Sequence, residues 1–371
     1  MDQRHGGMGM LPCLRPDLAT LAVYHPQARE LGTDWLDGNE FPLDWPAPLK
    51  EKLVWLYRQD IANNRYPDGS HGEVKQELCH YIQEGLGTTP SPVTPEWLTV
   101  GNGSDELIRS LLIATCLGQN AGILIAEPTF SMYKILARTL GIPVWTAARD
   151  EQFAMCLPQA TELINQEPIR VVFVVHPNSP TGNGLTLQER EWLRQLPPKI
   201  LVVIDEAYFE FSQDTLLPDL LAHPNWVILR TFSKGFRLAN LRVGYAIAHP
   251  EVICALEAVR LPYNLTGFSL LAAHLALTQR RQLLSAIPEI LTERERLWAE
   301  LQKIPGIQVW VSQANFLYCR STTHPPEWLH QRLQELGSLV RHTGGGLRLT
   351  IGTPAENTRL LQRLRQVVLS L

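Results

Sequence analysis

A lysine, an aspartate and a tyrosine stand just past apolar segments of this chain, where side chains can do chemistry. Lys234 follows the apolar run Trp226-Val-Ile-Leu, which is typical of a buried strand. Burial and nearby cations favour the neutral form of a lysine amine, which can then bond to an aldehyde as an imine. Taken alone, the segment is more often a solvated Ser-Lys-Gly loop, so the hypothesis depends on the rest of the chain.

A second apolar segment ends in a carboxylate. Val202-Val-Ile-Asp-Glu-Ala-Tyr208 is typical of a central parallel strand that presents Asp205 at its C-terminal edge. Such a carboxylate can pair with a pyridinium nitrogen and make the ring an electron sink, and Tyr208 can donate to a phenolic oxygen of the ring. A capping aspartate and a packing tyrosine are the alternative. Only one connecting segment and the next strand fit between Asp205 and Lys234, so both are expected at the edge where open α/β sheets bind ligands.

A glycine-containing turn provides a candidate phosphate site. Residues 98–108 run from a short strand into a helix, and Gly101 and Gly103 permit a tight turn between them. Amides at a helix N-terminus favour an anion, although an aspartate that caps an ordinary helix would give the same pattern. The groups predicted to complete the site are the amides of Ser104 and Asp105, the hydroxyls of Thr231 and Ser233, and the guanidinium of Arg242. The combined pattern predicts pyridoxal 5′-phosphate (PLP) as the cofactor.

Three further segments fit a PLP site. Phe130 follows an apolar strand and could lie flat against the cofactor ring, although a core aromatic is the more frequent use of a phenylalanine. The turn His176-Pro-Asn-Ser-Pro-Thr-Gly182 carries the amide of Asn178. Tyr66 lies in a polar turn that could equally be an ordinary surface turn.

These motifs, in this order, resemble the fold-type I aminotransferases, and among them most closely the histidinol-phosphate aminotransferase family. The similarity extends from about Tyr24 to the C-terminus. It rests on Leu36-Asp-Gly-Asn-Glu-Phe-Pro42, Arg65-Tyr-Pro-Asp, Gly103-Ser-Asp-Glu, Pro128-Thr-Phe, Pro177-Asn-Ser-Pro-Thr-Gly182, Asp205-Glu-Ala-Tyr, Thr231-Phe-Ser-Lys and Leu347-Arg-Leu-Thr-Ile-Gly-Thr353. The resemblance implies an α/β fold of the fold-type I PLP transferases, with a mostly parallel mixed sheet between helices and a smaller α+β C-terminal domain.

The resemblance also implies roles for individual residues. Lys234 would hold the cofactor aldehyde and move a proton, Asp205 would pair with the pyridine nitrogen, and Tyr208 would bond the phenolic oxygen. The phosphate would be held by Ser104, Asp105, Thr231, Ser233 and Arg242, and Phe130 would stack on the ring. In a homodimer, Tyr66 would reach the phosphate site of the second subunit. Arg348 would bind the carboxylate of glutamate or 2-oxoglutarate, and the residues that close over the substrate would be Tyr24, Asn39 and Arg341.

One motif departs from the family pattern. The family reads Asn-Pro-Asn-Asn-Pro-Thr-Gly, and the Asn directly before the second Pro approaches the phenolic oxygen of the cofactor. This chain has Ser179 at that position and His176 at the first position. Either the Ser179 hydroxyl substitutes or Asn178 turns inward, and Asn178 is the residue predicted here.

The implied function is that of a PLP-dependent transaminase in histidine biosynthesis. It would exchange the amino group between L-histidinol phosphate and 2-oxoglutarate in a ping-pong mechanism, giving imidazole-acetol phosphate and L-glutamate. An arginine pair such as Arg341 and Arg348 can serve the anionic groups of both substrates, although ordinary surface charge is an alternative for each. A threonine-phosphate decarboxylase-like lyase would use the same cofactor residues, and a broad-specificity aromatic aminotransferase is a second alternative. A non-catalytic sensor domain is disfavoured, because such modules usually carry a basic DNA-binding segment, whereas this sequence shows no basic N-terminal helix-turn-helix pattern and has Lys234.

Composition narrows the remaining classes. The chain has 371 residues, of which 19% are charged and 45% apolar, a profile that argues against disorder. A net charge of −4 gives no footprint for nucleic acid. The apolar runs are too short for a membrane span, and the N-terminus lacks an apolar signal region. Six scattered cysteines without metal-ligand spacing predict reduced thiols, no bound metal and a cytoplasmic protein.

Three regions are predicted along the chain. An N-terminal arm at residues 1–45 would pack on the small domain and the substrate site, a large PLP-binding domain would occupy residues 46–260, and a small C-terminal domain residues 261–371. Strands are predicted at 97–101, 122–126, 171–175, 201–205, 226–232 and 243–248, and their alternation with helix patterns indicates a mostly parallel sheet covered on both faces. One long helical pattern at 267–303 precedes strands near 307–311, 315–319 and 347–351 and a closing helix at 355–370.

Overall fold

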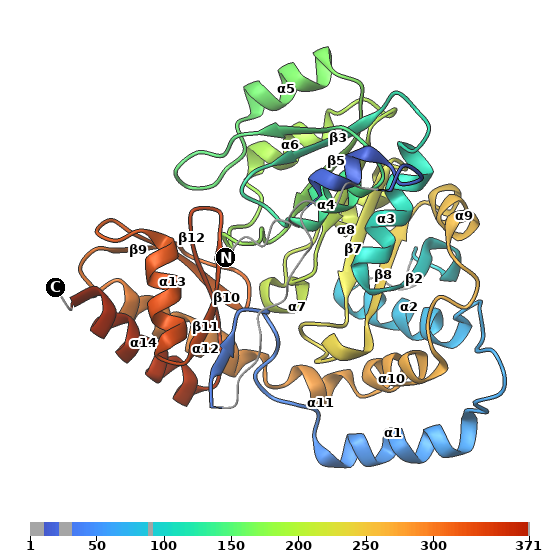
Figure 1. Ribbon diagram of the computed structural model, residues 1–371. Helices are drawn as coiled ribbons and strands as arrows, with labels where there is room; N and C mark the ends of the chain where they lie inside the picture. Colours follow the sequence, from blue (N-terminus) through green and yellow to red (C-terminus); the bar gives the residue numbers. More distant parts are fainter. Residues whose placement is uncertain (1–10, 22–31, 88–91, 370–371) are drawn as a thin grey trace.

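Two sheets organise the chain into two lobes (Figure 1). The computed structural model describes residues 11–21, 32–87 and 92–369. The larger lobe is built on a seven-stranded sheet and the smaller lobe on a five-stranded sheet. The predicted Tyr24 lies outside the described residues.

The seven-stranded sheet is mostly parallel, as predicted. Its order is β2-β8-β7-β6-β5-β3-β4, and β8 alone runs antiparallel to its neighbours among the described strands. The strands are β2 (Leu98–Asn102), β3 (Gly122–Ala126), β4 (Val144–Ala147), β5 (Ile169–Val175), β6 (Leu201–Asp205), β7 (Trp226–Thr231) and β8 (Val243–Ala248). Their apolar, β-branched sequences are those of strands buried on both faces.

Helices cover both faces of this sheet, and consecutive side chains of one strand enter opposite layers. In β3, Ile123 and Ile125 pack with residues of α3 and α9, whereas Leu124 packs in the layer that contains α2 and α10. The helices of this lobe are α1 (Ala47–Asp60), α2 (Gly72–Leu86), α3 (Gly103–Thr115), α4 (Met132–Thr139), α5 (Leu157–Gln166), α6 (Leu187–Arg194), α7 (Phe209–Ser212), α8 (Leu217–Ala222), α9 (Pro250–Val259), α10 (Gly267–Thr278) and α11 (Arg280–Leu284), with short 3-10 turns at Pro16–Thr20, Pro95–Trp97 and Ala239–Leu241.

The smaller sheet pairs a strand from the N-terminal part of the chain with four strands from its C-terminal part. Its order is β1-β11-β12-β10-β9, and β1 runs parallel to β11 while the other pairs are antiparallel. Its strands are β1 (Asp34–Leu36), β9 (Ile307–Val309), β10 (Phe316–Ser321), β11 (Ser338–Thr343) and β12 (Gly346–Thr350), and its helices are α12 (Ile287–Leu301), α13 (Pro326–Glu335) and α14 (Pro354–Leu369). Asp34 also accepts hydrogen bonds from Arg359 and Arg363 of α14, which fix β1 on this lobe.

The structure corrects several sequence expectations. The single helical pattern at 267–303 is wrong: it is three helices, because Gln279 leaves the helical region at φ −107° and ψ 20° and Pro288 stands in the first turn of α12. The strands β1, β4 and β11 were not predicted. The boundary at residue 261 stays a prediction, and the packing of α10 side chains such as Leu275 around the larger sheet favours a boundary nearer Ile287.

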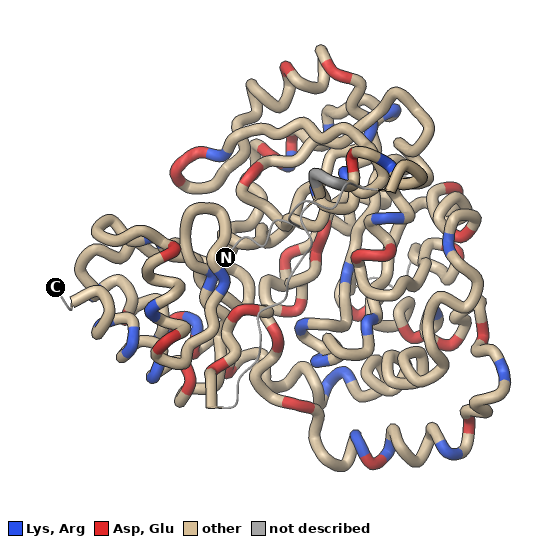
Figure 2. Tube along the Cα trace, viewed as in Figure 1, with Lys and Arg blue, Asp and Glu red and all other residues tan. Residues whose placement is uncertain are grey.

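Charge is distributed without a dominant sign. In the view of Figure 2, acidic and basic residues alternate over both lobes, in keeping with the net charge of −4. Within the described ranges, no helix combines the length and apolarity that a bilayer crossing requires.

Candidate active site

A cavity of about 840 Å³ lies at the C-terminal edge of the larger sheet, between that edge and the smaller lobe. Most of the predicted site residues line it together. They are Asn39, Ser104, Asp105, Phe130, Asp205, Tyr208, Thr231, Ser233, Lys234, Arg242, Arg341 and Arg348. Residues from the arm, both sheets and α3 therefore meet in one cavity, although they are far apart in the sequence.

Lys234 follows the end of β7 and points its amine at the arm. Its Nζ donates to the backbone oxygen of Gly38 at 2.8 Å. Burial lowers the pKa of Lys234 to about 8, and repulsion from Arg348 and Arg242 acts in the same direction. About a tenth of the amine is therefore neutral and nucleophilic at pH 7, far more than for a lysine with an ordinary pKa of ~10.4.

Asp205 ends β6 and faces the same cavity. Its Oδ1 accepts from the backbone N–H of Ala207 at 3.0 Å, and its Oδ2 accepts from the Tyr133 hydroxyl at 2.7 Å. Burial raises the pKa of Asp205 to about 6, and these two hydrogen bonds oppose that rise. The carboxylate thus stays available to pair with a cationic ring nitrogen.

The neighbouring carboxylate, Glu206, serves a different purpose. It is fully buried and makes an ion pair of 2.8 Å with Arg230, and it also accepts from the Thr215 hydroxyl at 2.9 Å. Because consecutive side chains at a strand end point to opposite sides, Asp205 lines the cavity and Glu206 does not.

Tyr208 is tied to the N-terminal arm. The Asn39 side-chain amide donates to the Tyr208 oxygen at 2.9 Å. Thr350 of β12 holds Asn39 through two hydrogen bonds, one to its backbone N–H and one to its side-chain oxygen. Asn39 has a φ of 51°, a left-handed conformation that asparagine tolerates better than most residues. The arm, the smaller sheet and Tyr208 are therefore coupled at one point.

The start of α3 forms a cradle for an anion. Gly103 adopts a φ of 71°, and a Cβ there would lie 2.5 Å from Nη2 of Arg242. A Cβ on Gly244 would lie 2.6 Å from the backbone nitrogen of Ser104. Thr231 donates to Ser233 at 3.0 Å beside this helix N-terminus. Amides, two hydroxyls and a guanidinium around one small space fit a phosphate group.

Two arginines face the cavity from the smaller sheet. Arg341 of β11 and Arg348 of β12 are directly opposite each other in the antiparallel register. Arg348 donates to the Ser179 hydroxyl at 3.1 Å and to the backbone oxygen of Asp37 at 2.5 Å. Like charges opposite each other in a sheet repel, so this pair is suited to an anionic ligand that screens it.

Asn178 does not line the cavity, contrary to its predicted approach to the cofactor. Its amide nitrogen donates to the Pro128 oxygen at 3.1 Å and to the Thr181 hydroxyl at 2.6 Å, and its oxygen accepts from Thr129 at 3.0 Å. Both ends of the buried amide are thus already engaged. Ser179 does line the cavity, so the position of these two residues supports the alternative in which the serine hydroxyl substitutes.

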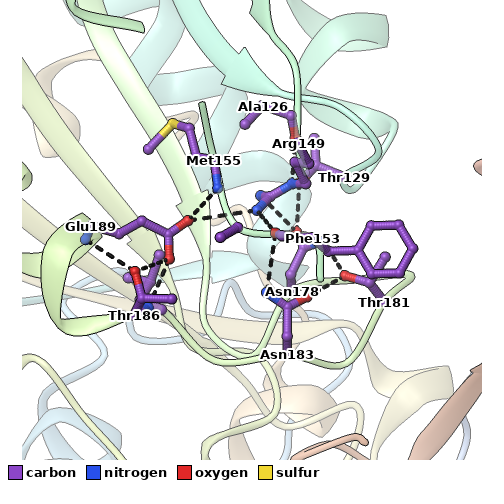
Figure 3. Close-up of polar contacts among 12 residues, drawn as sticks. Ala126, Thr129, Arg149, Phe153, Met155, Asn178, Thr181, Asn183, Thr186 and Glu189 are labelled. Atoms are coloured by element: carbon purple, nitrogen blue, oxygen red, sulfur yellow. Dashed lines mark hydrogen bonds and ion pairs between the residues drawn. The ribbon is translucent and has the colours of Figure 1, made fainter. Parts of the chain in front are cut away.

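A buried arginine that the sequence did not reveal supports this loop. Figure 3 shows the guanidinium of Arg149 among the oxygens of Ala126, Phe153 and Asn178, to which it donates at 3.0, 2.7 and 3.3 Å. Glu189 lies 3.9 Å away and offsets its charge. Burial lowers the pKa of Arg149 to about 10. This network fixes the turn that carries Ser179, which lines the cavity.

Tyr66 lies away from the cavity of its own chain. It is 81% exposed, and its ring stacks on Tyr263 at 4.5 Å. Both tyrosines line a separate surface hollow of about 1450 Å³, next to the exposed Leu261. The structure therefore does not bring Tyr66 together with Lys234 within one chain.

Comparison with known proteins agrees with this geometry. Residues 36–364 match the family model for aminotransferase class I and II. A histidinol-phosphate aminotransferase from Synechococcus sp. (strain JA-2-3B'a(2-13)) is 55% identical over 97% of this chain and 100% of its own length. The chain belongs to the histidinol-phosphate aminotransferases of the class I and II family. A relative with the same printed name from Trichodesmium erythraeum (strain IMS101) is 53% identical over 96% of this chain and 100% of its own length.

Solved structures of other proteins share the fold. A histidinol-phosphate aminotransferase from Sinorhizobium meliloti in complex with pyridoxal-5'-phosphate aligns with a TM-score of 0.84 at 22% identity, over 98% of this chain and 100% of that chain. An L-threonine-O-3-phosphate decarboxylase from Porphyromonas gingivalis aligns with a TM-score of 0.75 at 20% identity, over 91% and 99%. The backbone fold is thus common to aminotransferases and a decarboxylase, and side chains must distinguish the reactions.

The anion cradle can be tested at Gly103. In Gly103→Ala, the new Cβ would displace the Arg242 guanidinium from the cradle, so the dissociation constant for PLP should rise about tenfold or more, as expected for the loss of a charge-assisted contact. Gly118→Ala is the matched control, since Gly118 has a similar φ of 74° and no heavy atom within 4 Å of its Cβ position. Equal PLP affinities of the two variants, measured by equilibrium titration, would refute the cradle.

The lowered pKa of Lys234 predicts how the protein takes up PLP at different pH. Because the neutral amine is the nucleophile and its fraction rises with pH, the rate of colour formation on adding PLP to cofactor-free protein should rise through a midpoint near pH 8. Arg348→Met removes a neighbouring cation and should move the midpoint to higher pH. Arg332→Met, an exposed arginine of α13, should not. Identical midpoints in all three proteins would contradict the electrostatic origin of the shift.

Proposed function

We propose that this enzyme transfers the amino group of L-histidinol phosphate to 2-oxoglutarate, giving imidazole-acetol phosphate and L-glutamate in a ping-pong reaction of histidine biosynthesis. The observation that carries the proposal is the meeting of Lys234 and Asp205 in one cavity with the facing pair Arg341 and Arg348. The printed names of relatives at 50–55% identity over nearly the whole chain support the same substrate.

The cavity residues fit PLP, and each can be assigned to one part of the cofactor. When bound, PLP supplies an electron sink for charge that develops at the substrate α-carbon. Lys234 would hold its aldehyde, Asp205 would pair with the pyridine nitrogen, and the hydroxyls of Tyr208 and Ser179 would bind the phenolic oxygen. The Ser104 and Asp105 amides, Thr231, Ser233 and Arg242 would hold the phosphate, and Phe130 would stack on the ring.

Lys234 also moves the proton that the reaction requires. Its Nζ takes the proton from the substrate α-carbon and returns a proton during the same half-reaction, so both its neutral and its charged forms must be accessible. A pKa of about 8 permits both near neutral pH. Nζ also donates to the Gly38 oxygen at 2.8 Å, a contact that keeps the amine in the cavity.

The arginine pair binds the two anionic substrates in turn. Histidinol phosphate brings a phosphate and 2-oxoglutarate brings a second carboxylate, and a guanidinium can bind either with two hydrogen bonds. Arg348 takes the carboxylate of glutamate or 2-oxoglutarate, and Arg341 with Asn39 contacts the remainder of the substrate. Tyr24 stays a predicted substrate residue.

Steady-state kinetics test the substrate assignment. With 2-oxoglutarate as acceptor, kcat/KM for histidinol phosphate should exceed that for phenylalanine, tyrosine and aspartate by about tenfold or more, because the other donors lack the phosphate that the arginines bind. Lys234→Ala should abolish turnover with every donor. Carbon dioxide release from L-threonine phosphate that outpaces transamination would overturn the proposal in favour of the lyase, and comparable rates with aromatic donors would favour the broad-specificity alternative.

We further propose a homodimer in which Tyr66 completes the phosphate site of the partner chain. Its high exposure, the ring stack with Tyr263 and the exposed apolar Leu261 beside the surface hollow support a protein contact at this face. We also propose a cytoplasmic location, where reducing conditions would keep its six cysteines as thiols.

Hybrid dimers test the shared site. A mixture of the inactive variants Tyr66→Ala and Lys234→Ala should regain roughly a quarter of wild-type activity, since half of the dimers are hybrids and each has one intact site. Mixing Asp205→Asn with Lys234→Ala is the matched control, because both residues belong to the cavity of one chain; this mixture should stay inactive. No recovery in the first mixture, despite subunit exchange confirmed by mass spectrometry, would exclude the shared site.

A further inference from the structure

Tyr133 is a fully buried tyrosine next to the cavity, and neither its sequence context nor the proposed reaction gives it a role. It lies in the first turn of α4, and its ring stacks on Phe173 of β5 at 4.6 Å. The ring also meets the edge of Phe130 at 5.5 Å. These contacts fix the ring in one orientation, and thereby fix where its hydroxyl points.

That hydroxyl donates to Oδ2 of Asp205 at 2.7 Å. The other oxygen, Oδ1, has the backbone N–H of Ala207 as its donor at 3.0 Å. A hydrogen bond from a hydroxyl to a carboxylate is charge-assisted and stronger than one between neutral groups. With one donor on each oxygen, the plane of the carboxylate is fixed while lone pairs remain for a cationic partner in the cavity.

The same hydrogen bond favours the charged form of Asp205. Burial raises the pKa of Asp205 to about 6, and the Tyr133 hydroxyl is the largest contribution that opposes this rise. Burial also raises the pKa of Tyr133 well above its ordinary value, so the phenol stays protonated and remains a donor. Without that donor the pKa of Asp205 would rise further, toward neutral pH.

We propose that Tyr133 is a positioning residue that keeps the Asp205 carboxylate ionised and oriented toward the pyridine nitrogen of PLP. The proposal rests on the proposed function, because it gives Tyr133 its effect through the pairing of Asp205 with the cofactor. It differs from a packing role in that one oxygen atom carries the effect, whereas the ring carries the contacts with Phe173 and Phe130.

Tyr133→Phe removes that oxygen and retains the ring, so the fold should be preserved. The dissociation constant for PLP should rise several-fold, and kcat should fall about tenfold with little change in the KM for histidinol phosphate, as expected when an interaction of the reacting state is weakened. The acid limb of the kcat/KM profile should move to higher pH, because a carboxyl with a higher pKa is neutralised at higher pH.

Tyr81→Phe is the matched control. Tyr81 is likewise buried and donates to a buried carboxylate, Glu210, at 3.2 Å, but neither residue lines the cavity. Its substitution should leave PLP affinity and the pH profile unchanged. Circular dichroism and thermal unfolding of both variants without cofactor report whether the loss of either hydroxyl disturbs the fold.

A double-mutant cycle shows whether Tyr133 acts through Asp205. In an Asp205→Asn background, Tyr133→Phe should have little further effect on PLP affinity, because the group it acts on is gone. An undiminished effect in that background, or wild-type affinity and pH profile in Tyr133→Phe, would overturn the proposal. If instead the wild-type protein failed to bind PLP at all, the proposed function itself would fall.

Discussion

Removal of charged groups from water at the C-terminal edge of the larger sheet is the constraint on which this site depends. Burial disfavours the charged form of any group, so it lowers the pKa of Lys234 to about 8 and raises that of Asp205 to about 6. The two values approach neutrality from opposite sides. One physical cause thereby prepares a nucleophilic amine and leaves a carboxylate whose ionisation depends on its hydrogen-bond donors.

Different parts of the molecule supply the two kinds of group in the cavity. Strand ends of the larger sheet supply the residues assigned to the cofactor, such as Asp205 and Lys234, whereas the smaller sheet and the arm supply the residues assigned to the substrate, Asn39, Arg341 and Arg348. Asn39 and the Gly38 oxygen connect the lobes directly by bonding Tyr208 and Lys234. A change in the position of the arm would therefore alter the hydrogen bonds of Tyr208 and Lys234, which are assigned to the cofactor.

The loop with Ser179 illustrates how the surroundings determine which side chain faces a site. Asn178 is held by Thr129, Arg149 and Thr181, so its amide is committed to the interior (Figure 3). The serine that follows turns to the cavity and binds Arg348. A short hydroxyl thus lines the cavity beside Arg348, and the buried network of Arg149 and Glu189 supports the turn that carries it.

The sequence by itself indicated many of the strand ends and the positions of Asp205 and Lys234, because β-branched runs that stop at a polar residue report a local property of buried parallel strands. It also indicated the anion cradle from glycines before a helix. The resemblance to a known family indicated most of the other predicted site residues. Only the tertiary structure turned Asn178 inward and Ser179 toward the cavity, and gave Asp205 its donor in Tyr133. It also divided the pattern after Gly267 into three helices and directed Tyr66 away from the cavity of its own chain. Those outcomes depend on partners remote in sequence, whose contacts fix side-chain rotamers that no local pattern encodes.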